Sequence, residues 1–265
     1  MTNSDPHSQA AVNKADSIAV VIPAYNEAAT IRDLVIKTLT FVDNVIIVDD
    51  GSTDDTIDCL KDLNVTVIEH EVNKGKGESL WDGMRYALDM DADAIITLDG
   101  DGQHSPEDIP ALLDKYEQNP DTLVIAARLL NRQNAPRARL FANQFADFWV
   151  SWASGQCIYD SQSGFRLYPA AILQAVTVPH DYTRGFVFES EIIIESCRKK
   201  FPCVAVPINS VYHSDARASH FRPVLDIAKI VLMIAWKIIS RALYLPGLIN
   251  IIGCRAKTPT QKPID

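Results

Sequence analysis

The chain has 265 residues, of which 47% are hydrophobic and 22% are charged, and its net charge is −9. This balance fits a globular protein with one large domain, or with one domain and an appendage, and it excludes an intrinsically disordered chain. From Cys197 onward there are 11 basic and three acidic residues, a net charge of +8, whereas the preceding part carries −17. An acidic body argues against nucleic-acid binding, and a basic C-terminal part suits an anionic surface.

Residues 1–16 are polar and lack the apolar stretch of a secretory signal, so they are expected to form a disordered leader. The chain contains five scattered cysteines and no C-x-x-C pattern. This usage predicts reduced thiols rather than a disulfide framework.

From residue 17 onward, apolar runs alternate with helical patterns. The runs expected to form strands are 18–22, 45–48, 65–68, 94–98 and 123–127. Helices are expected over 26–40, 54–63 and 76–90, and from Pro106, which follows the capping residue Ser105. Continuous apolar strands separated by helices predict an α/β fold, with a mostly parallel central sheet and helices on both faces.

Three polar clusters follow expected strands, at 23–27, 49–53 and 99–103. Ligands in such sheets bind outside the carboxyl ends of the strands. The sequence therefore predicts that these clusters meet at one rim.

The third cluster contains Asp99 and Asp101, separated by one glycine, and then Gln103. These side chains offer hard oxygen ligands that suit Mg²⁺ or Mn²⁺ bridging a diphosphate. The alternative is a solvated Asp/Gly turn. In the second cluster, Ser52 or Thr53 is expected to cap the following helix. The loop at 73–77 contains two glycines and leads into a predicted helix. Its backbone amides and Lys76 could contact a phosphate.

Together these motifs resemble glycosyltransferase family 2, whose members have the nucleotide-sugar-binding GT-A fold. The similarity rests on VIPAYNE at 21–27, VDDGSTDDT at 48–56 and LDGDGQHSP at 98–106. Within the family, the Gln-His after the D-x-D and DSQSGFR at 160–166 are most similar to the branch of dolichyl- and polyprenyl-phosphate mannose or glucose synthases.

The resemblance implies a role for each matching residue. The nucleotide would be lined by Pro23, Tyr25, Glu27, Asp50, Lys76 and Asp99. The metal would be held by Asp99, Asp101 and Gln103, with Asp101 and Asp160 acting in catalysis. The acceptor and its phosphate would be bound by Arg128, Arg139, Arg217, Ser219 and His220.

The implied activity is inverting, metal-dependent transfer of a hexose, from a donor of the GDP-mannose or UDP-glucose type, to a lipid-linked polyprenyl phosphate. An alternative is a hydroxyl acceptor with Asp160 as base. A non-catalytic nucleotide-binding protein is a more remote alternative. A hydrolase of the haloacid-dehalogenase type is disfavoured, because the aspartate clusters of this sequence do not match its Asp-x-Asp-x-Thr/Val pattern. His220 and Asn143 stand where the branch usually has lysine and serine. The Q-x-x-R-W of processive members is absent, which favours a single transfer.

Glu189 and Glu191 lie among apolar residues. The sequence leaves two interpretations open for them: contact with the sugar or acceptor, or ion pairs with Arg166 or Arg184.

Residues 17–221 are expected to form the catalytic domain, and 222–253 are strongly apolar. On a helix the charged residues Arg222, Asp226, Lys229, Lys237 and Arg241 fall along one narrow stripe. This pattern predicts membrane-interfacial helices rather than a span, and a core helix is the alternative. A basic tail follows at 254–265. The body is expected at the cytoplasmic face of a membrane, and a homo-oligomer is possible.

Overall fold

The computed structural model describes residues 18–131, 137–178, 187–209 and 223–257, without the side chains of 137–139, 223–228 and 254–257. The leader 1–16, the loop residues Arg217, Ser219 and His220, and the side chain of Arg139 therefore lie outside the described residues.

One sheet of seven strands organises the described chain, in the order β3-β2-β1-β4-β6-β5-β7. The strands are β1 (Ile18–Ala24), β2 (Asn44–Asp49), β3 (Thr66–Glu69), β4 (Ala94–Thr97), β5 (Leu123–Arg128), β6 (Arg166–Pro169) and β7 (Cys203–Ile208). Only β6 runs antiparallel to its neighbours, β4 and β5. The α/β fold with a mostly parallel sheet, predicted from the alternating apolar runs, is confirmed.

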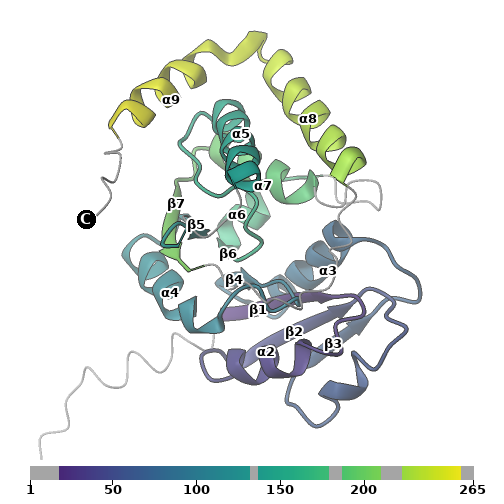
Figure 1. Cartoon of the computed structure of the whole chain (residues 1–265). Coiled ribbons are helices and arrows are strands. Elements are labelled where there is room, and N and C mark those ends of the chain that lie inside the picture. Colours follow the sequence, from purple (N-terminus) through teal and green to yellow (C-terminus); the bar gives the residue numbers. More distant parts are fainter. Residues whose placement is uncertain (1–17, 132–136, 179–186, 210–222, 258–265) are drawn as a thin grey trace, which may run out of the picture.

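Helices cover both faces of this sheet (Figure 1). On one face lie α2 (Ile31–Thr38) and α4 (Ile109–Gln118), the latter preceded by the short helix η2 (Pro106–Asp108). The other face is covered by α3 (Lys76–Asp89), α5 (Arg137–Ser154), α6 (Ala170–Ala175) and α7 (Val187–Arg198).

Two apolar cores result, one on each face of the sheet. In β1, Ala19 and Val21 join the core beneath α3, whereas Val20 and Ile22 join the core beneath α2. Helix α3 approaches the sheet closely at Gly83, because a Cβ there would lie 2.4 Å from Val21 Cγ1. Burial on both faces explains why these strands are continuous apolar runs.

Two predicted helices differ from the structure. The first begins at Ile31 rather than at 26, because Asn26 has a left-handed φ of 58° and the chain turns before the helix starts. Residues 54–63 form turns and one short helix, η1 (Asp58–Leu60). Ser52 therefore does not cap a helix; its hydroxyl accepts from the backbone N–H of Asn26 instead.

Three of the five cysteines, Cys59, Cys197 and Cys203, are free thiols. Cys157 is disulfide-bonded. The expectation of reduced thiols is therefore wrong at this position.

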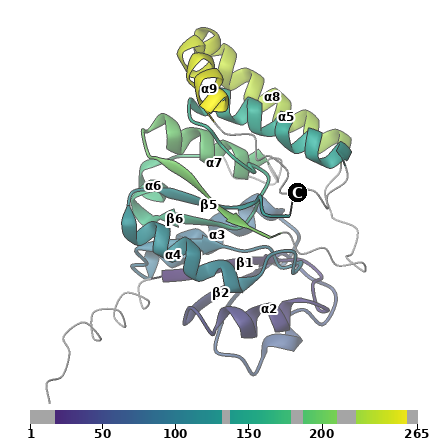
Figure 2. The same ribbon diagram turned by 60° about the vertical axis from the view of Figure 1, so that its left-hand side comes forward.

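The C-terminal helices α8 (Pro223–Ile239) and α9 (Leu245–Lys257) form an outer layer beside α5 and α7, joined by η4 (Ala242–Tyr244) (Figures 1 and 2). Helix α8 buries Ile234 and Ile238 but exposes Leu232 and Trp236, so it packs on the domain and presents a second apolar face outward. Among the described residues, no single helix suffices to span a membrane by length and hydropathy. A pair bent by 99°, 229–239 with 242–253, passes that test together.

Lys237 on α8 does not face outward. Its ammonium lies 2.8 Å from Glu191 Oε1 and 2.5 Å from Glu195 Oε1, both on α7. This residue of the expected charged stripe thus holds α8 against the domain. Of the two interpretations for Glu191, the structure shows an ion pair, and its described partner is Lys237; Arg184 lies outside the described residues.

Candidate active site

The three polar clusters meet at the carboxyl ends of β1, β2 and β4, as the topology of a parallel sheet requires. The backbone N–H of Asp50 donates to Ala24 O at 2.8 Å, which joins the first two clusters. The hydroxyl of Thr30 donates to Gly100 O at 2.8 Å, and a Cβ at Gly100 would lie 3.1 Å from Pro23 O. Pro23, Glu27 and Asp50 therefore lie on the same rim as the D-x-D segment.

Asp50 organises the loop that leads into α3. Its buried carboxylate accepts from the backbone N–H of Lys74 at 2.7 Å and of Gly75 at 2.8 Å, and it contacts His70 Nδ1 at 2.9 Å. The loop is thereby fixed beside the rim, immediately before Lys76. Sequence reasoning missed His70, because nothing near it in the chain marks it as part of the site.

Lys76 contributes a cation at the centre of the site. Its ammonium lies 2.7 Å from Asp99 Oδ1 and 3.0 Å from Glu189 Oε2. Burial alone would lower the pKa of Lys76, but these two carboxylates raise it above its ordinary value. For Asp99, burial would raise the pKa, and the charge and hydrogen bond of Lys76 lower it overall. Lys76 therefore stays protonated and Asp99 stays ionised.

Asp101 is the second carboxylate of the motif, and it accepts from the backbone N–H of Gln103 at 3.0 Å. Burial and the neighbouring charge of Asp99 raise its pKa. Adding a cation would relieve this repulsion, and two carboxylates with an amide oxygen suit Mg²⁺ or Mn²⁺. The donor set thus fits a divalent metal, although the described part of the chain contains no cluster of three or more His, Cys, Asp or Glu side chains arranged around one point.

Gly164 leaves the space that the Asp99 carboxylate occupies. A Cβ at this position would lie 2.4 Å from Oδ2 and 2.6 Å from Oδ1 of Asp99. Thr97 at the end of β4 donates its hydroxyl to Gly164 O at 2.7 Å, which holds the two segments together. The SGFR segment at 163–166 therefore packs directly against the D-x-D motif.

His104 lies between the D-x-D segment and the next pair of charged residues. Burial is the main cause that lowers its pKa to about 4. The charge of Arg128 lowers this pKa further, whereas the charges of Asp99 and Asp160 raise it. Its Nδ1 is buried and has no hydrogen-bond partner in the described structure. The ring packs against Phe165 with centroids 5.6 Å apart. His104 is therefore neutral at neutral pH.

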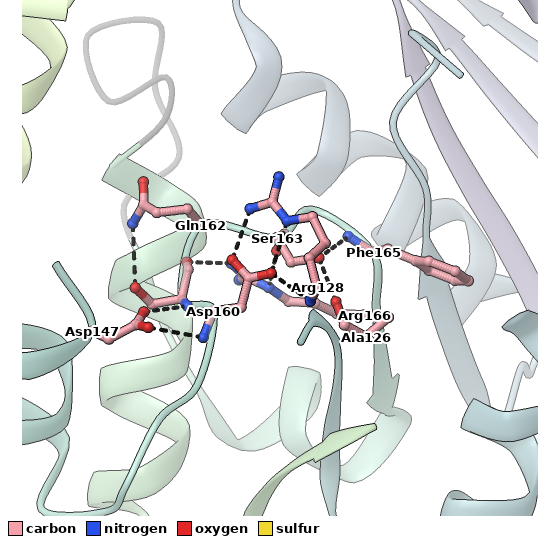
Figure 3. Close-up of polar contacts among 9 residues, drawn as sticks. Ala126, Arg128, Asp147, Asp160, Gln162, Ser163, Phe165 and Arg166 are labelled. Atoms are coloured by element: carbon pink, nitrogen blue, oxygen red, sulfur yellow. Dashed lines mark hydrogen bonds and ion pairs between the residues drawn. The ribbon is translucent and has the colours of Figure 1, made fainter. Parts of the chain in front are cut away.

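Arg128 and Asp160 form a bidentate pair (Figure 3). Arg128 Nε lies 2.8 Å from Asp160 Oδ2 and Nη2 lies 2.7 Å from Oδ1, while the Arg128 backbone N–H also donates to Oδ2. Burial would raise the pKa of Asp160, but the hydrogen bonds and charge of Arg128 lower it overall. A carboxylate with a lowered pKa and a committed cationic partner is a poor general base.

Two further side chains hold the loop that carries Asp160, and sequence reasoning missed one of them. The buried carboxylate of Asp147 on α5 accepts from the backbone N–H groups of Asp160 at 3.1 Å and Ser161 at 2.7 Å (Figure 3). The buried guanidinium of Arg166 donates to Ser161 O at 2.9 Å and Ser163 O at 2.7 Å. These contacts fix Asp160 in its left-handed conformation, with φ of 55°.

Of the two interpretations for Glu189, the structure shows an ion pair, although with Lys76 and not with Arg166; Arg184 lies outside the described residues, and contact with the sugar or acceptor stays a prediction. The Glu189 carboxylate pairs with Lys76 at the site, while its backbone carbonyl accepts from Arg166 at 2.6 Å. Tyr25 is half-buried on the rim, directly after β1.

The comparisons with known proteins agree with this geometry. The model of the family described as "Glycosyl transferase family 2" matches residues 19–173. A UDP-N-acetylglucosamine–dolichyl-phosphate N-acetylglucosaminyltransferase of Methanococcus voltae is 31% identical, over 86% of this chain and 95% of that protein. An undecaprenyl-phosphate mannosyltransferase of Micrococcus luteus is 27% identical, over 73% of this chain and 83% of that protein.

Among solved structures, the fold is similar to glucosyl-3-phosphoglycerate synthase from Mycobacterium tuberculosis, crystallised with Mn²⁺ and UDP. The TM-score is 0.61 at 23% identity, covering 91% of this chain and 85% of that one. This likeness confirms the GT-A-like arrangement of the sheet and helices. The chain is a glycosyltransferase and belongs to glycosyl transferase family 2.

Proposed function

We propose that this enzyme transfers a sugar from a nucleoside diphosphate sugar to a polyprenyl phosphate at a membrane surface. The observation that carries the proposal is the double role of α5. Asp147 on its inner side holds the backbone of Asp160, and Phe141 and Phe145 on its outer side are 71% and 51% exposed. A helix that joins a charged site to an exposed apolar surface suits an acceptor with a charged head and an apolar tail.

The acceptor chemistry fits the Arg128–Asp160 pair. A guanidinium carries five N–H donors in a planar fork that matches a phosphate, and Asp160 orients it. The phosphate is already an anion, so its oxygen can attack the anomeric carbon without a general base. The new C–O bond to the acceptor forms as the C–O bond to the nucleoside diphosphate breaks, with inversion. The low pKa of Asp160 therefore favours a phosphate over a hydroxyl acceptor.

The donor would lie along the rim from Asp50 to Asp99. Lys76 places a permanent positive charge where the diphosphate would leave, at the start of α3. A divalent ion held by Asp99, Asp101 and Gln103 would neutralise charge on the departing diphosphate. Pro23, Tyr25 and Glu27 stay predicted contacts of the nucleotide, and their place directly after β1 supports this prediction.

Membrane association is supported by the distribution of exposed apolar side chains. Of the 15 exposed large hydrophobic side chains in the described structure, ten lie on α5, α8, η4 and α9. We call this set the apolar surface. It comprises Phe141, Phe145, Val231, Leu232, Trp236, Ile239, Leu243, Leu245, Ile249 and Ile252. Such a patch marks an interaction site, and the lipid acceptors named for the relatives favour a bilayer as its partner; the cytoplasmic face stays a prediction.

The test is a transfer assay with the full chain. UDP-N-acetylglucosamine, GDP-mannose and UDP-glucose are each offered with a polyprenyl phosphate in detergent, with Mn²⁺, with Mg²⁺ or with EDTA. We expect one donor to label the lipid, and we expect EDTA to abolish labelling. Transfer to hydroxyl acceptors such as a polyprenol, without transfer to the phosphate, would contradict the proposal.

A further inference from the structure

His70 bridges two carboxylates from different elements. Its Nδ1 lies 2.9 Å from Asp50 Oδ1, directly after β2, and its Nε2 lies 3.1 Å from Asp82 Oδ2, on α3. The imidazole is 3% exposed, and the carboxylates of Asp50 and Asp82 are 6% and 15% exposed. We call this arrangement the clasp. These are side-chain contacts, separate from the backbone hydrogen bonds of β2 and α3. The clasp therefore adds a link between the end of β2 and helix α3.

The number of ring protons decides how the clasp is built. A carboxylate only accepts hydrogen bonds, and a neutral imidazole has one N–H, so it can donate to only one of two carboxylates. The imidazolium donates to both. Two basic side chains also contact Asp82: Arg85 Nη2 lies 3.0 Å from Asp82 Oδ1, and Lys74 Nζ lies 3.9 Å from Asp82 Oδ2.

The clasp ends on the loop that leads to Lys76. The Asp50 carboxylate that contacts His70 also accepts from the backbone N–H groups of Lys74 and Gly75. Earlier in the same loop, Val72 packs closely on Gly51, the residue that follows Asp50. A Cβ at Gly51 would lie only 3.0 Å from Val72 C. Lys76, which contacts Asp99, follows immediately. Movement of Asp50 would therefore move the residues that meet the diphosphate.

We propose that His70 is a positioning residue for donor binding, and that Asp82 acts on the donor site through it. The proposal rests on the proposed function only for the identity of the ligand. Asp82 contacts no residue of the D-x-D segment, yet its charge orients His70, which fixes Asp50 and the 74–75 amides. Removing the Asp82 charge is expected to weaken nucleoside diphosphate binding by about tenfold, because hydrogen bonds to charged groups are the stronger ones.

The first measurement needs no ligand. Hydrogen exchange of the Lys74 and Gly75 amides is followed by mass spectrometry in the wild type, Asp82→Asn and His70→Gln. We expect both variants to exchange faster in this loop. Asp89→Asn is the matched control, because Asp89 is exposed on the same helix and the variant removes the same charge. Unchanged exchange in Asp82→Asn would overturn the proposal.

The second measurement is calorimetric binding of UDP and GDP, each with Mn²⁺, to the same variants and to the double variant. A glutamine at 70 keeps N–H donors, but both are on a single nitrogen, so it lacks the two ring nitrogens by which His70 faces Asp50 on one side and Asp82 on the other. If Asp82 acts through His70, the double variant binds no more weakly than His70→Gln by itself. Additive losses would mean that Asp82 acts by another route, such as Lys74, and Lys74→Gln tests that route.

The two proposals fail differently. If the wild type binds neither nucleotide, the proposed donor class is wrong, and the exchange measurement still decides whether the clasp holds the loop. If the wild type binds and Asp82→Asn binds equally well, only the clasp is refuted. Thermal unfolding of each variant separates a local loss from a general one.

Discussion

The ammonium of Lys76 lies between Asp99 and Glu189, 2.7 Å and 3.0 Å from their carboxylate oxygens. One side chain at the start of α3 thus joins the D-x-D segment to α7. The contact keeps a cation at the centre of the site before any ligand binds, and it keeps Asp99 ionised.

Replacing Lys76 by Met is expected to lower kcat/KM for transfer by about 100-fold, because a fixed charge facing the departing diphosphate is lost. Lys76→Arg should retain more activity, since it keeps the charge but changes its position. Steady-state kinetics measures both. Lys61→Met is the control, because the Lys61 side chain is 70% exposed and pairs only locally with Asp58. Wild-type kinetics in Lys76→Met would rule out this role.

Gly164→Ala is expected to lower activity while leaving the fold intact. The new methyl group would stand 2.4 Å from Asp99 Oδ2, so the carboxylate must move away from its position beside Lys76. Transfer activity and Mn²⁺ affinity should both fall by at least about tenfold. Gly253→Ala is the matched control, because a Cβ there meets nothing within 4 Å. Equal effects of the two substitutions would show that Asp99 need not sit where the structure places it.

Much of the rim could be predicted from sequence. Asp99 and Asp101 directly follow an apolar run buried on both faces, and the topology of parallel strands brings their cluster to Pro23 and Asp50. These inferences need only the order of the elements. They do not depend on how distant helices pack.

The contacts that complete the site could not be predicted in this way. Lys76 meets Glu189 only because α3 and α7 cover the same face of the sheet, and periodicity does not tell which helices become neighbours. The same limit explains Lys237. A helical pattern places it on one stripe with other charged residues, but only the packing of α8 on α7 turns it toward Glu191.

The Arg128–Asp160 pair predicts a pH dependence of stability. The folded pKa of Asp160 is below its ordinary value, so the pair stabilises the protein fully above the unfolded pKa of about 4 and is lost as pH falls through the folded value. The difference in unfolding free energy between wild type and Asp160→Asn should be constant from about pH 5 upward and shrink below about pH 4. Urea denaturation over this range measures it.

Asp147 serves as a control, because its pKa is shifted in the opposite direction to that of Asp160. Burial raises its folded pKa above the ordinary value, so the folded state holds its proton more tightly, and its contribution falls as pH rises from about 4 toward the raised pKa. Wild type minus Asp147→Asn should therefore decrease as pH rises above about 4, where wild type minus Asp160→Asn has completed most of its rise and levels off. Parallel curves for the two variants would be inconsistent with the assigned pKa directions.

The apolar surface predicts binding to lipid vesicles. Leu232 and Trp236 on α8 are 70% and 69% exposed, and each would bury its side chain in the bilayer. Burying one large apolar side chain stabilises binding by about 1.5–3 kcal/mol, so Leu232→Ser with Trp236→Ser should weaken binding by at least about 100-fold. Flotation with vesicles containing anionic lipid measures this loss. Ile36→Ser, on α2 across the sheet, should bind as the wild type does. If the double variant floats normally, the apolar surface faces another protein rather than a bilayer.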